Sequence, residues 1–189
     1  MNSAGAGSGS TASTAASGEA SAGANTAGSG PVTAESLSDP DLGYTVVSIP
    51  EGLDATQTKV LQGFIAYDKL TWRIWSTGEG VENISEVATG TTRNDVVQNY
   101  AAREKGRLDR PPMRVAVTEV NVDQGGSAAT VKACVDSTKV VTIDSSGKDV
   151  SNPEKQVRVL ATEAMVLSPE GNWLASDEFT ESNTSCSVD

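Results

Sequence analysis

The chain has 189 residues, and 25 Asp and Glu against 14 Lys and Arg give it a formal net charge of -11. No stretch concentrates Lys or Arg, so nucleic acid and anionic lipid surfaces would repel it. It has no His, which removes the usual acid–base side chain at neutral pH and the commonest nitrogen ligand of transition metals. We therefore expect no metal, no cofactor and no hydrolase built on a Ser–His or Cys–His pair. Chemistry by Asp, Glu or Tyr stays open, as do cationic small molecules or basic proteins as partners.

The first part of the chain has low complexity. Between Met1 and Gly30 nearly every residue is Gly, Ala, Ser or Thr, and the only charged residue is Glu19. Such a segment cannot bury enough apolar surface to offset the entropy of ordering it. We expect a disordered stalk over residues 1–41 and one folded domain over residues 42–189. No signal peptide or membrane-spanning run is visible, and the sequence looks like one in which an initiator Met replaces an export signal.

Two cysteines, Cys134 and Cys186, allow a disulfide, two free thiols or half of a metal site. The metal reading is weak because about four ligands are needed and the chain has no His and no third Cys. A redox pair is usually close in sequence, and these two are not. We favour a disulfide over free thiols, which implies an oxidising compartment.

The clearest element is a helix that begins after Asp54 and ends before Gly78. Gln57 completes a capping box with Asp54. Asp68 falls on the same stripe as a set of apolar side chains at helical spacing: Leu61, Phe64, Ile65, Trp72 and Trp75, widened by Val60, Tyr67, Leu70 and Ile74.

Two shorter helices are expected to follow the long one. The first covers residues 81–90. The next is capped by Thr91 or Thr92, ends at Gly106 and turns four residues inward: Val96, Val97, Tyr100 and Ala101.

Strand signals flank the helices. Tyr44 to Ile49, halted by Pro50, predicts an extended lead-in or an edge strand. After Pro111, apolar and polar residues alternate in three segments: Met113, Val115 and Val117; Ala129, Val131, Ala133 and Val135; Val157, Val159 and Ala161. Trp173, Ala175 and Phe179 mark a last strand. This order predicts an α+β fold in which N-terminal helices pack on a curved antiparallel sheet of about four strands.

Several short motifs between Pro50 and Cys186 carry a family resemblance. They are Ile49-Pro50-Glu51-Gly52-Leu53, Ala88-Thr89-Gly90, Val131 to Ser137, Gly171-Asn172-Trp173 and Ser185-Cys186. With the elements in this order, the chain resembles the NTF2-like (cystatin-like) cone-shaped roll and, more narrowly, small secreted proteins and lipoproteins of actinobacteria. The resemblance implies that Cys134 pairs with Cys186. It also implies a lipidated cysteine just upstream of the stalk, at a position that is absent or replaced here, and a location outside the cytoplasm.

Five residues of the long helix are candidate walls of a ligand pocket: Phe64, Tyr67, Asp68, Trp72 and Trp75. Aromatic residues at helical spacing are more often core, so packing is the favoured interpretation of the four aromatic ones. A carboxylate among them would have a raised pKa and suit a general base, as acids do in NTF2-like isomerases and dehydratases. Asp68 would be that base, with Tyr67 or Glu119 as its partner, although a structural role is favoured for both acids. Asp136, on the strand face of Cys134, is expected to hold a local hydrogen bond.

The leading hypothesis is an exported, lipid-anchored cell-envelope protein with a non-catalytic binding or assembly role. Its partner would be an unidentified envelope protein or a small apolar ligand, and it would meet the membrane only through the implied anchor. One alternative is an isomerase- or dehydratase-like enzyme that uses a pocket carboxylate. Another is a component of a conjugation, secretion or phage-related envelope assembly.

Overall fold

The computed structural model describes residues 31–182 and 185–188. Residues 1–30, where the stalk is predicted, lie outside the described part. The compact domain begins at Val32, earlier than the predicted Leu42. A short helix, α1 (Ala34–Leu37), belongs to it, and its Leu37 is buried. Within the described residues, no helix has both the length and the apolar character that crossing a membrane requires.

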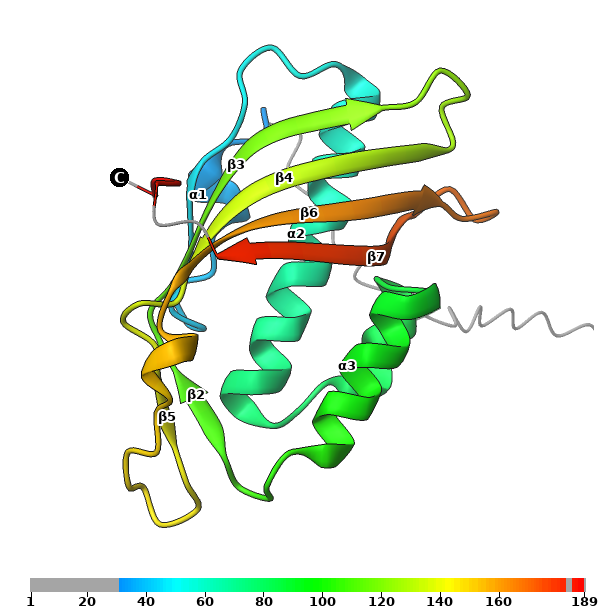
Figure 1. The fold of residues 1–189 in the computed structure, drawn as a ribbon. Helices are drawn as coiled ribbons and strands as arrows, with labels where there is room; N and C mark the ends of the chain where they lie inside the picture. Colours follow the sequence, from blue (N-terminus) through cyan, green and yellow to red (C-terminus); the bar gives the residue numbers. More distant parts are fainter. Residues whose placement is uncertain (1–30, 183–184, 189) are drawn as a thin grey trace, which may run out of the picture. The chain divides into compact units, whose positions relative to one another are not determined.

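A curved five-stranded sheet forms one layer of the domain (Figure 1). Its strand order is β1 (Tyr44–Ser48), β3 (Met113–Val122), β4 (Ala128–Asp136), β6 (Arg158–Leu167) and β7 (Trp173–Ser182). β1 pairs parallel with β3, and the other neighbours are antiparallel. β2 (Leu108–Arg110) and β5 (Val141–Ile143) form a separate two-stranded ladder.

The predicted α+β fold, with helices packed on a curved sheet, is confirmed. The main sheet has five strands rather than about four because β1 joins it by parallel pairing. Parallel strands are not linked by a hairpin, so no turn signal marks this pairing in the sequence. β2 and β5 have only three residues each, too few to show a period-two pattern.

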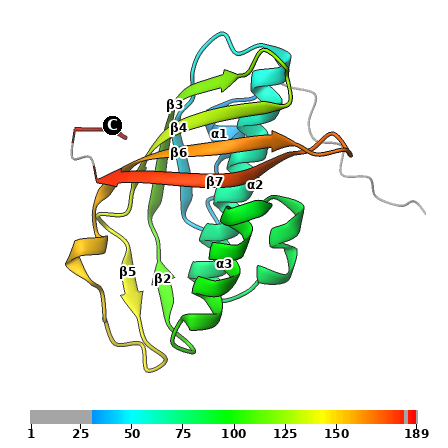
Figure 2. The same ribbon diagram turned by 45° about the vertical axis from the view of Figure 1, so that its right-hand side comes forward.

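The long helix α2 (Ala55–Thr77) lies across the concave face of the sheet (Figure 2). Asp54 caps it as predicted, because its Oδ1 accepts hydrogen bonds from the backbone N–H groups of Thr56 and Gln57 at 2.7 and 2.8 Å. The Gln57 side chain accepts from the Asp54 N–H and also donates to the carbonyl of Val120 on β3. The helix ends at Gly78, whose φ of 79° suits a left-handed cap.

The third helix, α3 (Gly90–Ala102), follows a 3₁₀ turn, η1 (Val81–Glu86). Its N-cap is Thr89 rather than Thr91 or Thr92. Thr92 and Val96 are buried, whereas Val97 is 43% exposed and Ala101 is also exposed. The predicted inward face was therefore wrong for these last two residues.

Gly63 lets α2 approach the sheet closely. A Cβ at this position would lie 2.7 Å from the Trp173 carbonyl oxygen and 2.8 Å from the Trp173 Cβ. Ala normally stabilises a helix interior by up to about 1 kcal/mol relative to Gly. Here we expect Gly63→Ala to lower the free energy of unfolding by roughly 1–3 kcal/mol, because helix and strand must separate. Urea unfolding measures this, and a stabilised variant would contradict the close approach.

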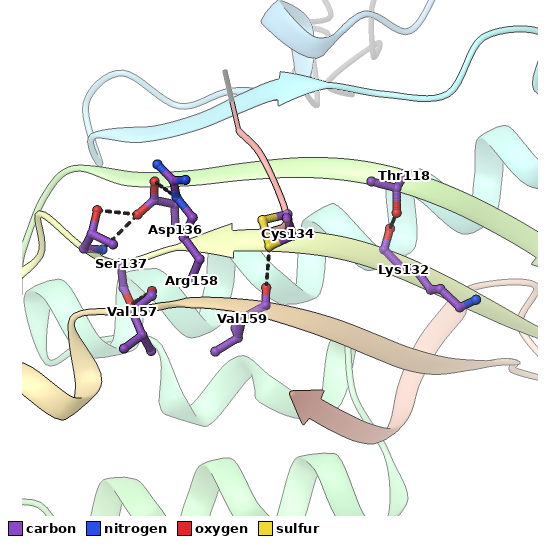
Figure 3. The surroundings of a disulfide bond; sticks show 10 residues. Thr118, Lys132, Cys134, Asp136, Ser137, Val157, Arg158 and Val159 are labelled. Atoms are coloured by element: carbon purple, nitrogen blue, oxygen red, sulfur yellow. Dashed lines mark hydrogen bonds and ion pairs between the residues drawn. A yellow bond between two sulfur atoms is a disulfide. The ribbon is translucent and has the colours of Figure 1, made fainter. Parts of the chain in front are cut away.

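Cys134 on β4 and Cys186 form a disulfide, as predicted (Figure 3). The bond holds the C-terminal segment on the convex face, where Val188 is fully buried and its carbonyl accepts from Arg114 at 2.6 Å. Asp136 also behaves as expected. It accepts from the backbone and hydroxyl of Thr138 and from Arg158 Nε at 3.0 Å. Burial raises the pKa of this carboxyl, but these hydrogen bonds outweigh it and hold the pKa below its usual value.

Candidate functional site

A cavity of about 370 Å³ lies between α2, α3 and the concave face of the sheet. All five predicted wall residues line it: Phe64, Tyr67, Asp68, Trp72 and Trp75. α2 also contributes Thr71. The remaining lining residues come from α3 and the strands: Thr92, Asp95, Val96, Asn99, Met113, Val135, Val159, Ala161, Glu163 and Glu178. Four of its lining residues are acids and none is Lys or Arg, so the cavity is both aromatic and acidic.

Asp68 faces this cavity from the middle of α2. Its Oδ2 accepts a hydrogen bond from the hydroxyl of Tyr44, which is fully buried on β1, at 2.5 Å. Burial raises the pKa of Asp68 to about 6, and the charge of Glu178 adds to the rise, while the Tyr44 hydrogen bond opposes it. The tyrosine bound to Asp68 is therefore Tyr44, which was predicted only as part of a lead-in strand.

The Tyr67 hydroxyl forms its hydrogen bond with a different acid from the one predicted. It donates to Glu178 Oε2 at 3.0 Å, not to Asp68. Burial is the main reason that the Tyr67 pKa lies far above its ordinary value, and neighbouring carboxylates add to the effect. Tyr67 is therefore a hydrogen-bond donor at any ordinary pH.

Glu163 is the most deeply buried acid of the cavity, with only 1% of its surface exposed. Its one hydrogen bond from the described residues comes from the Thr92 hydroxyl, 3.3 Å from Oε1. Burial, followed by the charge of Glu178, raises its pKa to about 9. Glu163 was not predicted as a site residue, although its position continues the inward alternation of Val159 and Ala161. A charged residue in a core-facing position of a strand was the available signal.

Glu178 lies directly opposite Glu163 across the β6–β7 pair. Burial and the charge of nearby Asp95 raise the pKa of Glu178, and the hydrogen bond from Tyr67 opposes this rise. Like charges at facing positions of neighbouring strands repel, so this pair costs stability. An irregularity in β7 places Glu178 here. Met165 pairs with Ala175 but Ala164 pairs with Asp177, which leaves Ser176 as an extra residue.

That extra residue decides which side chains face inward at the end of β7, the strand that Trp173, Ala175 and Phe179 mark in the sequence. Strict alternation from Trp173 and Ala175 would put Phe179 on the inner face and Glu178 outside. The bulge reverses this order after Ser176, and Phe179 is 62% exposed. Glu178 was missed for the same reason.

A second bulge removes Glu119 from the site. The pairing of β3 with β4 shifts between Val117 and Glu119, so Glu119 no longer continues the face of Val115 and Val117. It does not line the cavity, and it forms an ion pair with Lys132 at 2.7 Å and accepts from Asn121. Glu119 therefore does not partner Asp68, and its ion pair agrees with the structural role that is favoured for it.

The cavity adjoins a second hollow of about 550 Å³ toward β2 and β5, because the two share Trp72, Trp75, Asn99 and Met113. Arg103 lines this second hollow, with its guanidinium 5.3 Å from the Trp75 ring centre and 3.0 Å from Asp109. Across residues 31–182 and 185–188, no cluster of three or more acids or cysteines could hold a metal ion.

No protein-family model matches the chain, and none of the curated proteins has a significantly similar sequence. The intermembrane-space region of the chloroplast protein ARC6 is similar in structure, with 16% identity and a TM-score of 0.46, over 69% of this chain and 98% of that one. So is SalBIII, an epoxide hydrolase/cyclase-like enzyme in pyran ring formation in the polyether salinomycin. It has 14% identity and a TM-score of 0.36, over 67% of this chain and 92% of that one. At this similarity, neither indicates what this chain binds or catalyses.

Proposed function

We propose that the domain is a binding module that takes a small molecule into the cavity between α2, α3 and the sheet. The supporting observation is the cavity itself. A space of about 370 Å³ with aromatic walls and a few converging polar groups is the usual form of a small-molecule site. Core packing alone does not account for these acids, because burying Glu163 beside Asp68 and Glu178 without a cation costs stability.

We also propose that the module works outside the cytoplasm. The disulfide between Cys134 and Cys186 is consistent with an exported protein, since such bonds persist mainly in oxidising compartments. A lipid anchor upstream of the stalk is part of the same proposal and is supported by the resemblance to actinobacterial lipoproteins. Fractionation of cells that make the protein from its complete gene tests it, and material confined to the cytosol with free thiols would contradict it.

The binding proposal is tested by a titration with small aromatic alcohols, acids and amines, followed in ¹H–¹⁵N NMR spectra of the full chain. The chain has three tryptophans, which makes the indole N–H signals simple reporters. Trp72 and Trp75 line the cavity, and the Trp72 indole donates to the Leu42 carbonyl at 2.8 Å. Their signals should move on binding, whereas the signal of Trp173, which does not line the cavity, should stay in place.

Two substitutions on β6 provide a matched pair for that titration. Ala161 lines the cavity. Ala164 is three positions further along the same strand, so its side chain lies on the opposite face of the sheet. Ala161→Leu fills the cavity and should weaken binding at least about tenfold, because the ligand loses its space. Ala164→Leu should leave binding unchanged. Equal affinity in both variants, or no indole shift with any compound, would contradict the binding site.

A second candidate is catalysis by Asp68 on a molecule held in the same cavity. The observation that favours it is a carboxyl group with a pKa of about 6 that faces the cavity, where a general base is effective near neutral pH. Each compound that binds is incubated with the protein and followed for product by NMR. Turnover that Asp68→Asn abolishes without weakening binding would establish an enzyme.

A further inference from the structure

The charges around the cavity are unbalanced. Asp68 on α2, Asp95 on α3, Glu163 on β6 and Glu178 on β7 all line it, and Asp177 is close enough to raise the pKa of Glu163. The remaining titratable groups that face these acids are the hydroxyls of Tyr44 and Tyr67. No Lys or Arg lines the cavity, and no ion pair between described residues involves any of these acids.

We propose that the cavity binds a small organic cation, an ammonium group carried on an apolar body. This inference rests on the binding function proposed above and adds the chemical class of the ligand. A buried carboxylate is normally paired with a cation, and here the protein does not supply one. The ligand would supply it.

Glu163 is the group best placed to receive that cation. It is 99% buried and lines the cavity, and only its Oε1 accepts a hydrogen bond, from Thr92. Oε2 accepts none from the described residues. An N–H of an ammonium ligand would satisfy this oxygen and would form a charge-assisted hydrogen bond. Glu178, directly opposite on β7, would share the charge.

The aromatic walls suit the apolar body and the positive charge. Phe64, Tyr67 and Trp72 are nearly buried and line the same space as the acids. Faces of Trp and Tyr rings attract cations, and aromatic cages are a common way of binding ammonium groups. Trp75 already has a cationic neighbour, the Arg103 guanidinium. An apolar molecule without charge would fit the walls but would leave the acids unpaired.

The experiment compares 2-phenylethylammonium with 2-phenylethanol, which has the same apolar body without the charge. Isothermal titration calorimetry on the full chain gives both affinities from mildly acidic to mildly basic pH. We expect the ammonium compound to bind at least about tenfold more tightly at pH about 8, because Asp68 is ionised there and the bound ammonium group stabilises the ionised form of Glu163. Its advantage should shrink as the pH falls and the acids become protonated, and its binding should release protons.

Glu163→Gln keeps the shape of the side chain and removes the charge, so it should reduce the preference for the ammonium compound and leave the alcohol unaffected. Glu119→Gln, off the cavity, is the matched control and should change neither affinity. Equal binding of both compounds at every pH would overturn the cation proposal while the binding site stands. If neither compound binds and no other aromatic fragment moves the Trp72 and Trp75 signals, both proposals fail together.

Discussion

The protein should lose roughly 3–6 kcal/mol of unfolding free energy as the pH rises from about 5 to about 9, and Glu163→Gln should abolish most of this loss. Glu163 causes it because burial raises its pKa from 4.5 in the unfolded chain to about 9 in the folded one. Over that interval the folded state binds more protons than the unfolded state. A raised pKa of this kind contributes stability below the unfolded pKa, and that stability disappears as the pH rises through the folded value.

Other acids set the shape of the pH profile. Asp68 acts in the same direction between 3.8 and about 6, whereas Glu178 is solvent-exposed at the cavity and adds less. Asp136 has a lowered pKa, so its contribution is present at higher pH and is lost as the pH falls toward and below that value. Stability should therefore be greatest at mildly acidic pH.

Urea unfolding at a series of pH values measures this profile, with Glu119→Gln as the control. Glu119 lies on the neighbouring surface, paired with Lys132. Its substitution should leave the dependence of the unfolding free energy on pH, between neutral and basic pH, as it is in the wild type. A wild-type protein whose stability is constant across this interval, or a Glu163→Gln variant with the wild-type slope, would contradict a buried acid at this position.

Breaking the disulfide should have the other large effect. Cys134 and Cys186 are 52 positions apart, and closing a loop of that length contributes up to roughly 4 kcal/mol in the chain-entropy treatment. Reduction should therefore lower the unfolding free energy by roughly 2–4 kcal/mol. The contacts of the C-terminal segment, including the bond from Arg114 to the Val188 carbonyl, would weaken with it.

Urea unfolding with and without a reductant measures the effect, and the double variant Cys134→Ala/Cys186→Ala should match the reduced protein. A sample with thiol-alkylating reagent but no reductant is the control and should behave as the untreated protein. If reduction left the unfolding midpoint unchanged, the disulfide would not stabilise the fold.

The elements that could be predicted from the sequence are those whose signals are local. Asp54, Gln57 and Gly78 define both ends of α2 by chemistry within a few residues, and the stripe from Leu61 to Trp75 defines its buried face. Alternation in β3, β4 and β6 was equally local. The pairing of Cys134 with Cys186 was favoured over free thiols, since a metal site lacked further ligands and a redox pair lacked the close spacing, and the resemblance implied the same bond.

The acids of the cavity depended on longer-range geometry. The bulge at Ser176 exchanges the faces of Glu178 and Phe179, and the bulge before Glu119 turns that acid away. Neither bulge has a Gly or Pro signal in the sequence. Tyr44 reaches Asp68 only because β1 joins the sheet in parallel beside β3. Alternation beyond a bulge, and pairing between distant segments, cannot be read from one sequence.

A carboxyl titration by ¹³C NMR tests the acid-lined cavity most directly, because it reports each side chain separately. The structure predicts that Glu163 titrates near 9 and Asp68 near 6. Asp68→Asn should shift the Glu163 midpoint downward, since the ionised Asp68 raises the cost of ionising Glu163. A Glu163 midpoint close to the ordinary value of about 4.5 would mean that water surrounds this side chain, and the cavity described here would not exist.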